Sequence, residues 1–295
     1  MKAVMLREIG GDLTYEDVPE PEGETIEVKA AGINFSDVLI RTGNYPQAPE
    51  LPVVLGGEVA GELDGRRVMA LTLGRGGGYA ERAAVDPTWL ADLPEGASFA
   101  EGASFLTTYL TAWIPLKNLV EPGQTVLVHA AAGGVGTAAV QLAKHLGARV
   151  VATAGSPEKL EVALEAGADE TASYDEFPKA DVILDPVGGD VFARSLTALE
   201  PMGTLVAIGY AAGAWADVSP ALLVGRNISV QGFYLGRLMG HRPDLVRAAI
   251  DELLVLWTDG AVKPVVGAEF PLERAGEAHE LIASRRSFGK VVLVP

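Results

Sequence analysis

The sequence predicts an α/β fold in which a doubly wound parallel sheet is joined to a β-rich domain, and three observations support it. Residues 125–146 contain a short apolar run, a group of glycines and an amphipathic segment in direct succession. Strand-like and helix-like segments alternate after this stretch, whereas residues 1–107 contain short strand-like runs separated by Gly and Pro. The alternation predicts βαβ units, whose ligand lies at the carboxyl ends of the strands.

The glycine-rich turn predicts a dinucleotide site of the Rossmann type. Residues 126–128 are the apolar strand, and the turn at 131–136 reads AAGGVG before the helix. Small side chains let a pyrophosphate approach the backbone at the positive end of that helix. We therefore expect Ala132, Gly133, Gly134 and Val135 to contact the cofactor. The alternative is a tight strand-to-helix turn without a ligand, which the flanking strand and helix disfavour.

Composition limits the class of protein. A chain of 295 residues with 48% hydrophobic and 21% charged residues fits a globular protein of two domains. The absence of cysteine excludes disulfides and cysteine-ligated zinc, and the four histidines have no metal-ligand spacing. A net charge of −16 argues against a nucleic-acid partner. Since there is neither a long apolar run nor a signal-peptide core, we expect a cytoplasmic protein without a membrane partner.

The strand and helix boundaries follow from periodicity and from Gly and Pro. Residues 100–113 are expected to be helical, and residues 243–258 to form an amphipathic helix. The closing strand and helix segments lack a nucleotide motif and are expected to complete the first domain. The predicted domains are 1–107, completed by 233–295, and the nucleotide-binding domain 108–232. The expected strands are 2–6, 13–18, 25–31, 53–63, 149–154, 181–184, 204–208, 228–233, 262–266 and 290–294, and the further helices are 157–166, 190–199, 219–224 and 272–284.

Segments along nearly the whole chain resemble one family. The sequence is similar to the zinc-free medium-chain dehydrogenases/reductases of the quinone oxidoreductase, or zeta-crystallin-like, branch. The resemblance implies a GroES-like β-rich catalytic domain beside the Rossmann domain. The matching segments are GINFSDVLIRTGNYP (32–46), LGGEVAG (55–61), GGYAERAAV (77–85), LTAW (110–113), residues 126–159, DVILDPVGG (181–189), GTLVAIG (203–209) and SRRSFGKVVLVP (284–295).

The sequence departs from the zinc-dependent relatives of that family. They carry a cysteine near the position of Phe35, and a Gly-His-Glu triplet where this chain has Gly56, Gly57 and Glu58. We therefore expect no metal site and no zinc-assisted chemistry. The hairpin between Gly61 and Val68 is also shorter than is usual in the family.

The end of the second Rossmann strand predicts the cofactor. An NAD-preferring fold places Asp or Glu there, whereas this chain has ATAGS at 152–156. Ser156 and Lys159 are instead available for a 2′-phosphate, and the resemblance adds Tyr174 and Arg285, so we expect NADPH. Lys159 as a solvated helix residue and Arg285 in a surface ion pair are the alternatives. The family pattern also places Gly155, Val187, Gly188, Ile208 and Gly209 along the cofactor.

The resemblance assigns the reacting end of the site. It implies Asn34, Thr111 and Phe233 at the nicotinamide, with Thr107 and Thr108 competing with Thr111 because the register there is uncertain. Asn34 and Tyr45 are the expected catalytic hydrogen-bond donors. Thr111 in the core, and Tyr45 packed on the following proline, are the alternatives. Asp37 and Arg41 are four residues apart and are expected to form an ion pair.

The expected function is metal-free hydride transfer from NADPH to a quinone. The alternatives are reduction of 2-alkenals, enones or enoyl thioesters, and an NADPH-binding protein with a structural or regulatory role. The apolar segment from Asn227 to Phe233 predicts an exposed edge strand and hence a homodimer.

Overall fold

The computed structural model describes residues 1–73 and 76–295, which form two compact units. The first unit contains residues 1–107, 243–258 and 263–295, and the second contains residues 108–242 and 259–262. Residues 233–242 therefore belong to the second unit in this division, whereas the sequence placed them with the first. Among the described residues, no helix has the length and apolar character needed to cross a bilayer.

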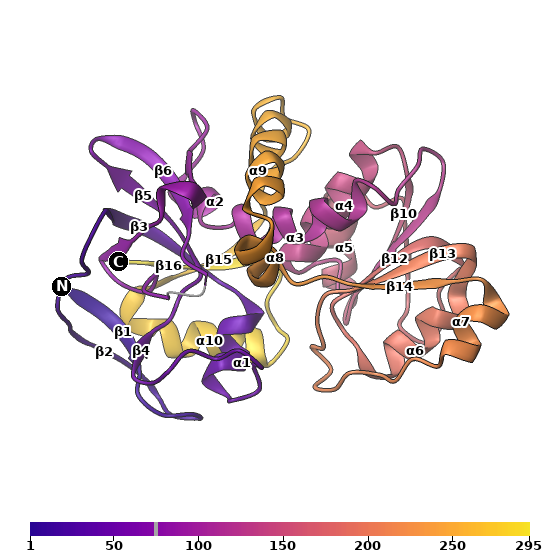
Figure 1. The fold of residues 1–295 in the computed structure, drawn as a ribbon, viewed down its shortest axis with the longest axis horizontal. Helices are drawn as coiled ribbons and strands as arrows, with labels where there is room; N and C mark the ends of the chain where they lie inside the picture. Colours follow the sequence, from indigo (N-terminus) through magenta and orange to yellow (C-terminus); the bar gives the residue numbers. More distant parts are fainter. Residues whose placement is uncertain (74–75) are drawn as a thin grey trace. The chain divides into compact units, whose positions relative to one another are not determined.

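The first unit is built on the nine-residue strand β3 (Thr25–Ile33), which lies between β16 (Lys290–Val294) and β5 (Glu58–Leu63). The last strand of the chain thus pairs with one of the first (Figure 1). A seven-stranded sheet has the order β15-β16-β3-β5-β6-β8, with β7 paired to β3, and a three-stranded sheet has the order β2-β1-β4. The other strands are β1 (Lys2–Leu6), β2 (Leu13–Asp17), β4 (Val53–Val54), β6 (Arg66–Leu71), β7 (Arg82–Ala84), β8 (Leu90–Asp92) and β15 (Val266–Pro271).

The core of the first unit joins the early strands to the C-terminal helix. Ile26 and Val28 of β3 are buried on one face, and Ala275 and Ala278 of α10 belong to the same apolar cluster. The tail therefore shares its core with the N-terminal strands, because neither part buries its apolar face alone. The helices of this unit are α1 (Phe35–Arg41), α2 (Phe99–Gly102), α9 (Pro243–Thr258) and α10 (Ala275–Ala283), with short 3₁₀ turns at Pro87–Trp89 and Leu272–Arg274.

Two strand predictions in this unit are wrong in part. The single strand expected at 53–63 is interrupted at Leu55, Gly56 and Gly57 between β4 and β5. Gly56 has φ 103°, and a Cβ there would lie 2.7 Å from the backbone nitrogen of Tyr79, so the chain turns sharply at this glycine. The strand expected at 262–266 begins only at Val266, after Pro264, which has no N–H for a ladder.

The second unit is a parallel sheet with the strand order of a Rossmann fold. The order is β11-β10-β9-β12-β13-β14, and every neighbouring pair is parallel. The glycine-rich turn follows the central strand β9, at the point where the strand order reverses. The strands are β9 (Thr125–Val128), β10 (Arg149–Thr153), β11 (Glu170–Ala172), β12 (Ala180–Asp185), β13 (Leu199–Ala207) and β14 (Ser229–Gly232).

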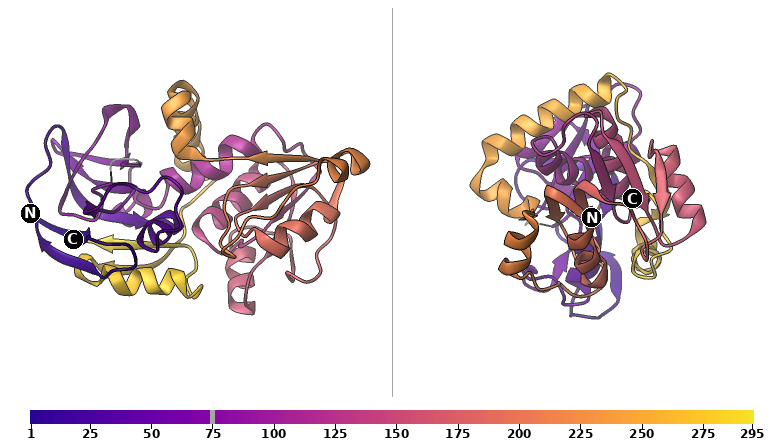
Figure 2. Two further views of the ribbon diagram at one scale, coloured as in Figure 1. Left: turned by 60° about the horizontal axis from the view of Figure 1, so that its bottom comes forward. Right: turned by 90° about the vertical axis from the view of Figure 1, so that its right-hand side faces the viewer.

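Helices cover both faces of this sheet, as Figures 1 and 2 show. Phe192 and Leu196 of α6 and Leu222 of α7 pack in one apolar cluster with the strands, and α4 and α5 pack beside β9, β10 and β11. The predicted α/β fold class, a doubly wound parallel sheet plus a β-rich domain, is confirmed. The helices are α3 (Leu106–Leu116), whose first two residues belong to the first unit, α4 (Gly134–His145), α5 (Pro157–Glu165), α6 (Gly189–Ala198), α7 (Pro220–Arg226) and α8 (Leu235–His241).

Candidate functional site

The residues expected to bind the cofactor in the second unit follow the carboxyl ends of its parallel strands. Because such ends meet at one edge of a sheet, the segments after six strands converge there. Ala132, Gly133, Gly134 and Val135 follow β9; Gly155, Ser156 and Lys159 follow β10; Tyr174 follows β11; Val187 and Gly188 follow β12; Ile208 and Gly209 follow β13; and Phe233 follows β14.

The glycine turn is shaped for close approach of the backbone. Ala130 has φ 49°, and a Cβ on Gly136 would lie 2.3 Å from the Ala130 carbonyl oxygen, so only glycine fits where α4 meets the turn. Gly133 is the N-cap of α4 and supplies no side-chain cap. Gly133, Gly134 and Val135 are partly exposed. The start of this helix can therefore receive an anion from its N–H groups.

A buried histidine fixes the ends of β9 and β10. His129 Nδ1 lies 2.7 Å from Thr153 Oγ1, and His129 Nε2 lies 2.8 Å from Ser195 Oγ. The Ser195 hydroxyl donates to the Val191 carbonyl, so Nε2–H is the donor to Ser195 and Nδ1 accepts from Thr153. Burial lowers the pKa of His129 to about 3. His129 is therefore a neutral structural residue beneath the glycine turn.

The region after β10 and β11 carries the groups expected at a 2′-phosphate. The Ala130 N–H donates to the Tyr174 hydroxyl at 3.1 Å, which attaches this tyrosine to the glycine turn. Lys159 is half-buried, and its desolvation lowers the pKa of its ammonium. A hydrogen bond from Ser156 lowers the pKa of the exposed Glu158 carboxyl. No Asp or Glu stands between β10 and Ser156, yet Glu158 lies only two residues beyond that serine.

The turn after β12 is held by Asp185. Its Oδ1 accepts from the N–H groups of Val187 at 2.6 Å and Gly188 at 3.1 Å. Gly188 has φ 74°, and a Cβ there would lie 2.8 Å from the Ala214 carbonyl oxygen. Burial raises the pKa of Asp185, and its Oδ2 is buried without a hydrogen-bond partner in the described residues. Because the N–H groups of Val187 and Gly188 are both bonded to Asp185, they hold the turn after β12 in its conformation.

The first unit gathers three polar groups, from Glu58, Thr107 and Lys290, around Asn34, the residue that joins β3 to α1. Asn34 Oδ1 accepts from Lys290 Nζ at 2.6 Å, and Asn34 Nδ2 donates to Glu58 Oε1 at 3.2 Å. Lys290 and Glu58 form an ion pair, with side chains 4% and 1% exposed. Glu58 Oε2 accepts from the Thr107 N–H at 3.0 Å. We call Asn34, Glu58 and Lys290 the buried triad.

A second buried chain of hydrogen bonds starts from the Asn34 N–H. Asp37 Oδ2 accepts from the Asn34 N–H at 2.8 Å and from the Tyr79 hydroxyl at 2.9 Å. His279 Nε2 lies 3.3 Å from the Tyr79 hydroxyl. Burial, partly offset by these two bonds, raises the pKa of Asp37 to about 6.

The ion pair expected between Asp37 and Arg41 is wrong. Arg41 Nε donates to the Gly11 carbonyl at 3.0 Å, and its guanidinium lies 3.8 Å from Asp12. Asp37 is 4% exposed and faces the core, whereas Arg41 lies at the end of the helix nearer to solvent. The helical spacing of four residues therefore did not determine which groups Asp37 and Arg41 bind.

The remaining expected residues are placed as follows. Tyr45 is half-buried in the loop after α1. Thr107 and Thr111 lie one turn apart on α3, and the Thr107 hydroxyl is buried without a partner in the described residues, whereas Thr108 is 2% exposed. Arg285 lies in the first unit after α10, where it is exposed and has φ 56°.

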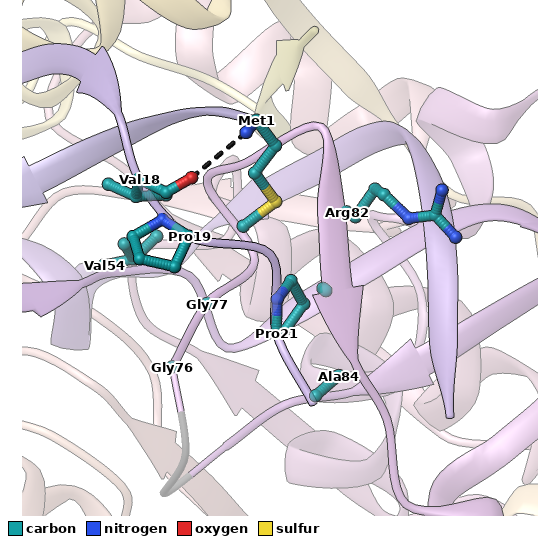
Figure 3. A pocket seen from close by; sticks show the side chains of 10 residues that line it. Met1, Val18, Pro19, Pro21, Val54, Gly76, Gly77, Arg82 and Ala84 are labelled. Carbon is teal, nitrogen blue, oxygen red and sulfur yellow. Dashed lines mark hydrogen bonds between the residues drawn. The ribbon is translucent and has the colours of Figure 1, made fainter. Parts of the chain in front are cut away.

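A separate cavity of about 260 Å³ lies in the first unit away from the triad (Figure 3). Met1, Val18, Pro19 and Pro21 form much of its wall, and the terminal ammonium of Met1 donates to the Val18 carbonyl at 3.0 Å. Arg82 contributes a charged side chain at its rim. None of the residues expected to bind cofactor or substrate lines this cavity.

Two family models and many known proteins match this chain. Residues 20–95 match the family model "Alcohol dehydrogenase GroES-like domain", and residues 134–254 match the model "Zinc-binding dehydrogenase". The chain is 36% identical to the quinone oxidoreductase-like protein 2 homolog of Nematostella vectensis, over 99% of this chain and 88% of that protein. The chain belongs to the quinone oxidoreductase family.

Other relatives of this family show its range. A crystal structure of the quinone oxidoreductase from Thermus thermophilus, determined also in complex with NADPH, has 41% identity and a TM-score of 0.93, with both chains fully covered. The human synaptic vesicle membrane protein VAT-1 homolog is 34% identical, over 94% of this chain and 80% of that protein. This branch of the medium-chain dehydrogenases/reductases lacks the zinc motif, and the described residues contain no cluster of three His, Cys, Asp or Glu that could hold a metal ion.

Sequence reasoning missed part of the first unit's polar cluster. Glu58 was noted only as the remnant of a zinc-family triplet, and Lys290 and Tyr79 were given no role. Lys290 stands before the apolar run VVLV, and Glu58 stands before VAG. A charge at the start of an apolar strand was the available signal, although such residues are usually solvated.

Proposed function

We propose that the protein is an NADPH-dependent oxidoreductase that transfers a hydride to a quinone without a metal ion. The observation that carries this proposal is the convergence of the glycine turn, Ser156, Lys159 and Tyr174 at one edge of a Rossmann sheet. The cofactor would supply the hydride, and the chain's own residues would orient it and stabilise charge on the acceptor oxygen.

NADPH is favoured over NADH by the charges near the end of β10. A 2′-phosphate needs hydrogen-bond donors and positive charge, which Lys159, Ser156 and Tyr174 offer, with Arg285 proposed from the family resemblance. The Thermus relative, whose structure was determined with NADPH, supports the same choice. Titration of both cofactors by fluorescence tests it, and equal affinity for NADPH and NADH would refute the phosphate site.

The class of hydride acceptor is inferred from the hydrogen-bond donors of the first unit. Asn34 and Tyr45 are proposed to donate hydrogen bonds to an oxygen conjugated with the carbon that receives the hydride, while alignment of donor and acceptor supplies most of the rate. The test is NADPH oxidation at saturating cofactor with 1,4-benzoquinone, 9,10-phenanthrenequinone, a 2-alkenal and a crotonyl thioester. Turnover with the last two alone would replace the quinone by an enone or enoyl-thioester substrate.

A protein that binds NADPH with little turnover is a second candidate. The similarity to the VAT-1 homolog, whose name describes a vesicle membrane protein rather than an enzyme, supports it. Tight NADPH binding without oxidation by any acceptor in the panel would favour this function. As the sequence alone suggests, we propose a cytoplasmic location for either function.

We also propose a homodimer formed through β14. This strand ends the sheet order, so its outer edge has unpaired backbone groups within the described part of the chain. Met202 and Val224 lie in the neighbouring β13 and α7 and are 82% and 77% exposed, which adds an apolar margin to that edge. Light scattering at micromolar concentration tests the proposal, and a monomeric mass would contradict it.

A further inference from the structure

The buried triad gives Asn34 a single possible orientation. If the side-chain amide turned over, its N–H groups would face the Lys290 ammonium and its oxygen would face the Glu58 carboxylate. Both hydrogen bonds would be replaced by repulsions in a buried site. The observed orientation, with Oδ1 on Lys290 and Nδ2 on Glu58, is therefore fixed by charge.

This orientation decides what Asn34 can offer to a ligand. Oδ1 is occupied by the ammonium, and one of the two Nδ2 protons is used by Glu58. The second Nδ2 proton has no partner among the residues that the structure describes. Asn34 is only half-buried, and the nearby Gly57 has no side chain; a Cβ there would lie 3.9 Å from Asn34 Nδ2. What remains is one hydrogen-bond donor, which recognises an acceptor oxygen.

The fold is built around the ion pair. Lys290 starts β16 and Glu58 starts β5, and these strands flank the end of β3. Between them, a Cβ on Gly32 would lie 2.9 Å from Lys290 Cε, 3.0 Å from Glu58 Cγ and 1.9 Å from the Ala103 carbonyl oxygen. Gly32 therefore makes the space that the two long side chains occupy.

Stability alone does not explain such a pair. Removing two charges from water is costly, and apolar side chains of similar volume often serve the core equally well. Lys290 Nζ and Glu58 Oε1, the two atoms that form the ion pair, both also bond to the neutral Asn34 amide. The contacts point to a role in holding that amide.

We propose that Glu58 and Lys290 are positioning residues that hold Asn34 as a donor-only contact for the carbonyl oxygen of the acceptor. The ammonium on Oδ1 also draws electron density from the amide and strengthens the remaining N–H as a donor. This inference rests on the proposed function, because it assigns Asn34 to the reacting end of the site.

The test replaces the ion pair by the neutral pair Glu58→Gln and Lys290→Met in one protein, so that no buried charge is left alone. Catalytic efficiency, kcat/KM for the quinone, is expected to fall at least about tenfold, as expected when one oriented donor is misplaced. Binding of 2′,5′-ADP, which has no nicotinamide, is expected to stay unchanged and reports that the second unit is intact. The matched control is E27Q/K29M, which neutralises an exposed ion pair within β3, and it should retain full activity.

A double-mutant cycle separates positioning from general support. If the pair acts through Asn34, then adding E58Q/K290M to N34A should lower kcat/KM no further. If the combined variant instead loses kcat/KM by the product of the two separate losses, the proposal is overturned and the pair supports the fold in another way.

A measurement without turnover keeps the inference separate from the proposed function. The ¹⁵N–¹H signals of the Asn34 side-chain amide, assigned by their loss in N34A, should shift in E58Q/K290M and exchange faster with solvent. Unchanged Asn34 signals would refute the positioning role even if the protein reduces quinones. Shifted signals in a protein that oxidises no NADPH would support the positioning of Asn34 while refuting the proposed reaction.

Discussion

Asp37 is a buried carboxyl whose replacement should stabilise the protein at neutral pH. Its side chain is 4% exposed, and both of its hydrogen bonds reach the same oxygen, Oδ2. In Asp37→Asn, the amide oxygen can keep both bonds, while the buried charge is removed. The perturbation therefore tests the cost of ionising this residue and leaves its contacts in place.

The magnitude follows from the pKa of Asp37, which burial raises from 3.8 to about 6. Each tenfold change in proton concentration is worth about 1.4 kcal/mol, so ionising Asp37 in the folded protein costs about 3 kcal/mol more than in the unfolded chain. The folded protein holds this proton more tightly than the unfolded chain. The contribution is thus complete below pH 3.8 and is lost as the pH rises through about 6.

The assay is urea unfolding of both proteins between about pH 4 and pH 7.5, followed by circular dichroism and fluorescence in parallel. The stability advantage of D37N is expected to grow by about 2.5 kcal/mol over this range, because part of the change already occurs below pH 4, and to level off above about pH 7. Asp12→Asn is the control, because the Asp12 side chain is fully exposed at 100% and water solvates it in both states. A D37N advantage that does not change with pH would refute the reasoning.

Three further substitutions test the second unit. Lys159→Ala is expected to weaken NADPH binding about tenfold, as for the loss of one charge-assisted bond, and to leave NADH binding unchanged in a fluorescence titration; equal losses would contradict a phosphate contact. Gly136→Ala should abolish nucleotide binding because of the 2.3 Å approach to the Ala130 oxygen, whereas Gly225→Ala, where a Cβ meets nothing within 4 Å, should bind normally. His129→Phe should lower the free energy of unfolding by about 2 kcal/mol near neutral pH. The folded pKa of His129 is about 3, against an ordinary 6.5, so its contribution to stability is present above pH 6.5 and is lost towards pH 3. As the pH falls over this range, H129F should therefore lose less unfolding free energy than the unaltered protein.

Local patterns in the second unit were sufficient to predict five of the six strands of its sheet, whereas the short edge strand β11 was missed. An apolar strand, a turn and a helix each lie within a few residues of one another, so the glycine turn, β10 and β12 were placed with errors of one or two residues. The cofactor residues follow these strands, because a βαβ unit brings its carboxyl ends to one edge. Glu158 was overlooked because it does not stand at the strand end. Its link to the expected phosphate site is a hydrogen bond from Ser156, which the sequence does not show.

The first unit was predicted less completely, because its contacts join distant parts of the chain. Glu58 and Lys290 are separated by 232 positions, and Asn34 lies 24 positions before Glu58. Helical spacing suggested Arg41 as the partner of Asp37, although the tertiary fold offered the Tyr79 hydroxyl, 42 positions away. Such pairings appear only once the strand register is known.

The register of β3 links these contacts to the chemistry. Along β3, Glu27 and Lys29 face solvent while Ile26 and Val28 face the core, but the last four residues, 30–33, are all buried. This change marks where the strand passes between β5 and β16, and there the small residue Gly32 admits two charged side chains. Asn34 follows at once, as the first residue that leaves the sheet. Our proposal that Asn34 contacts a polar ligand therefore includes the buried ion pair, because Lys290 and Glu58 bond to the Asn34 side chain while Asp37 bonds to its backbone N–H.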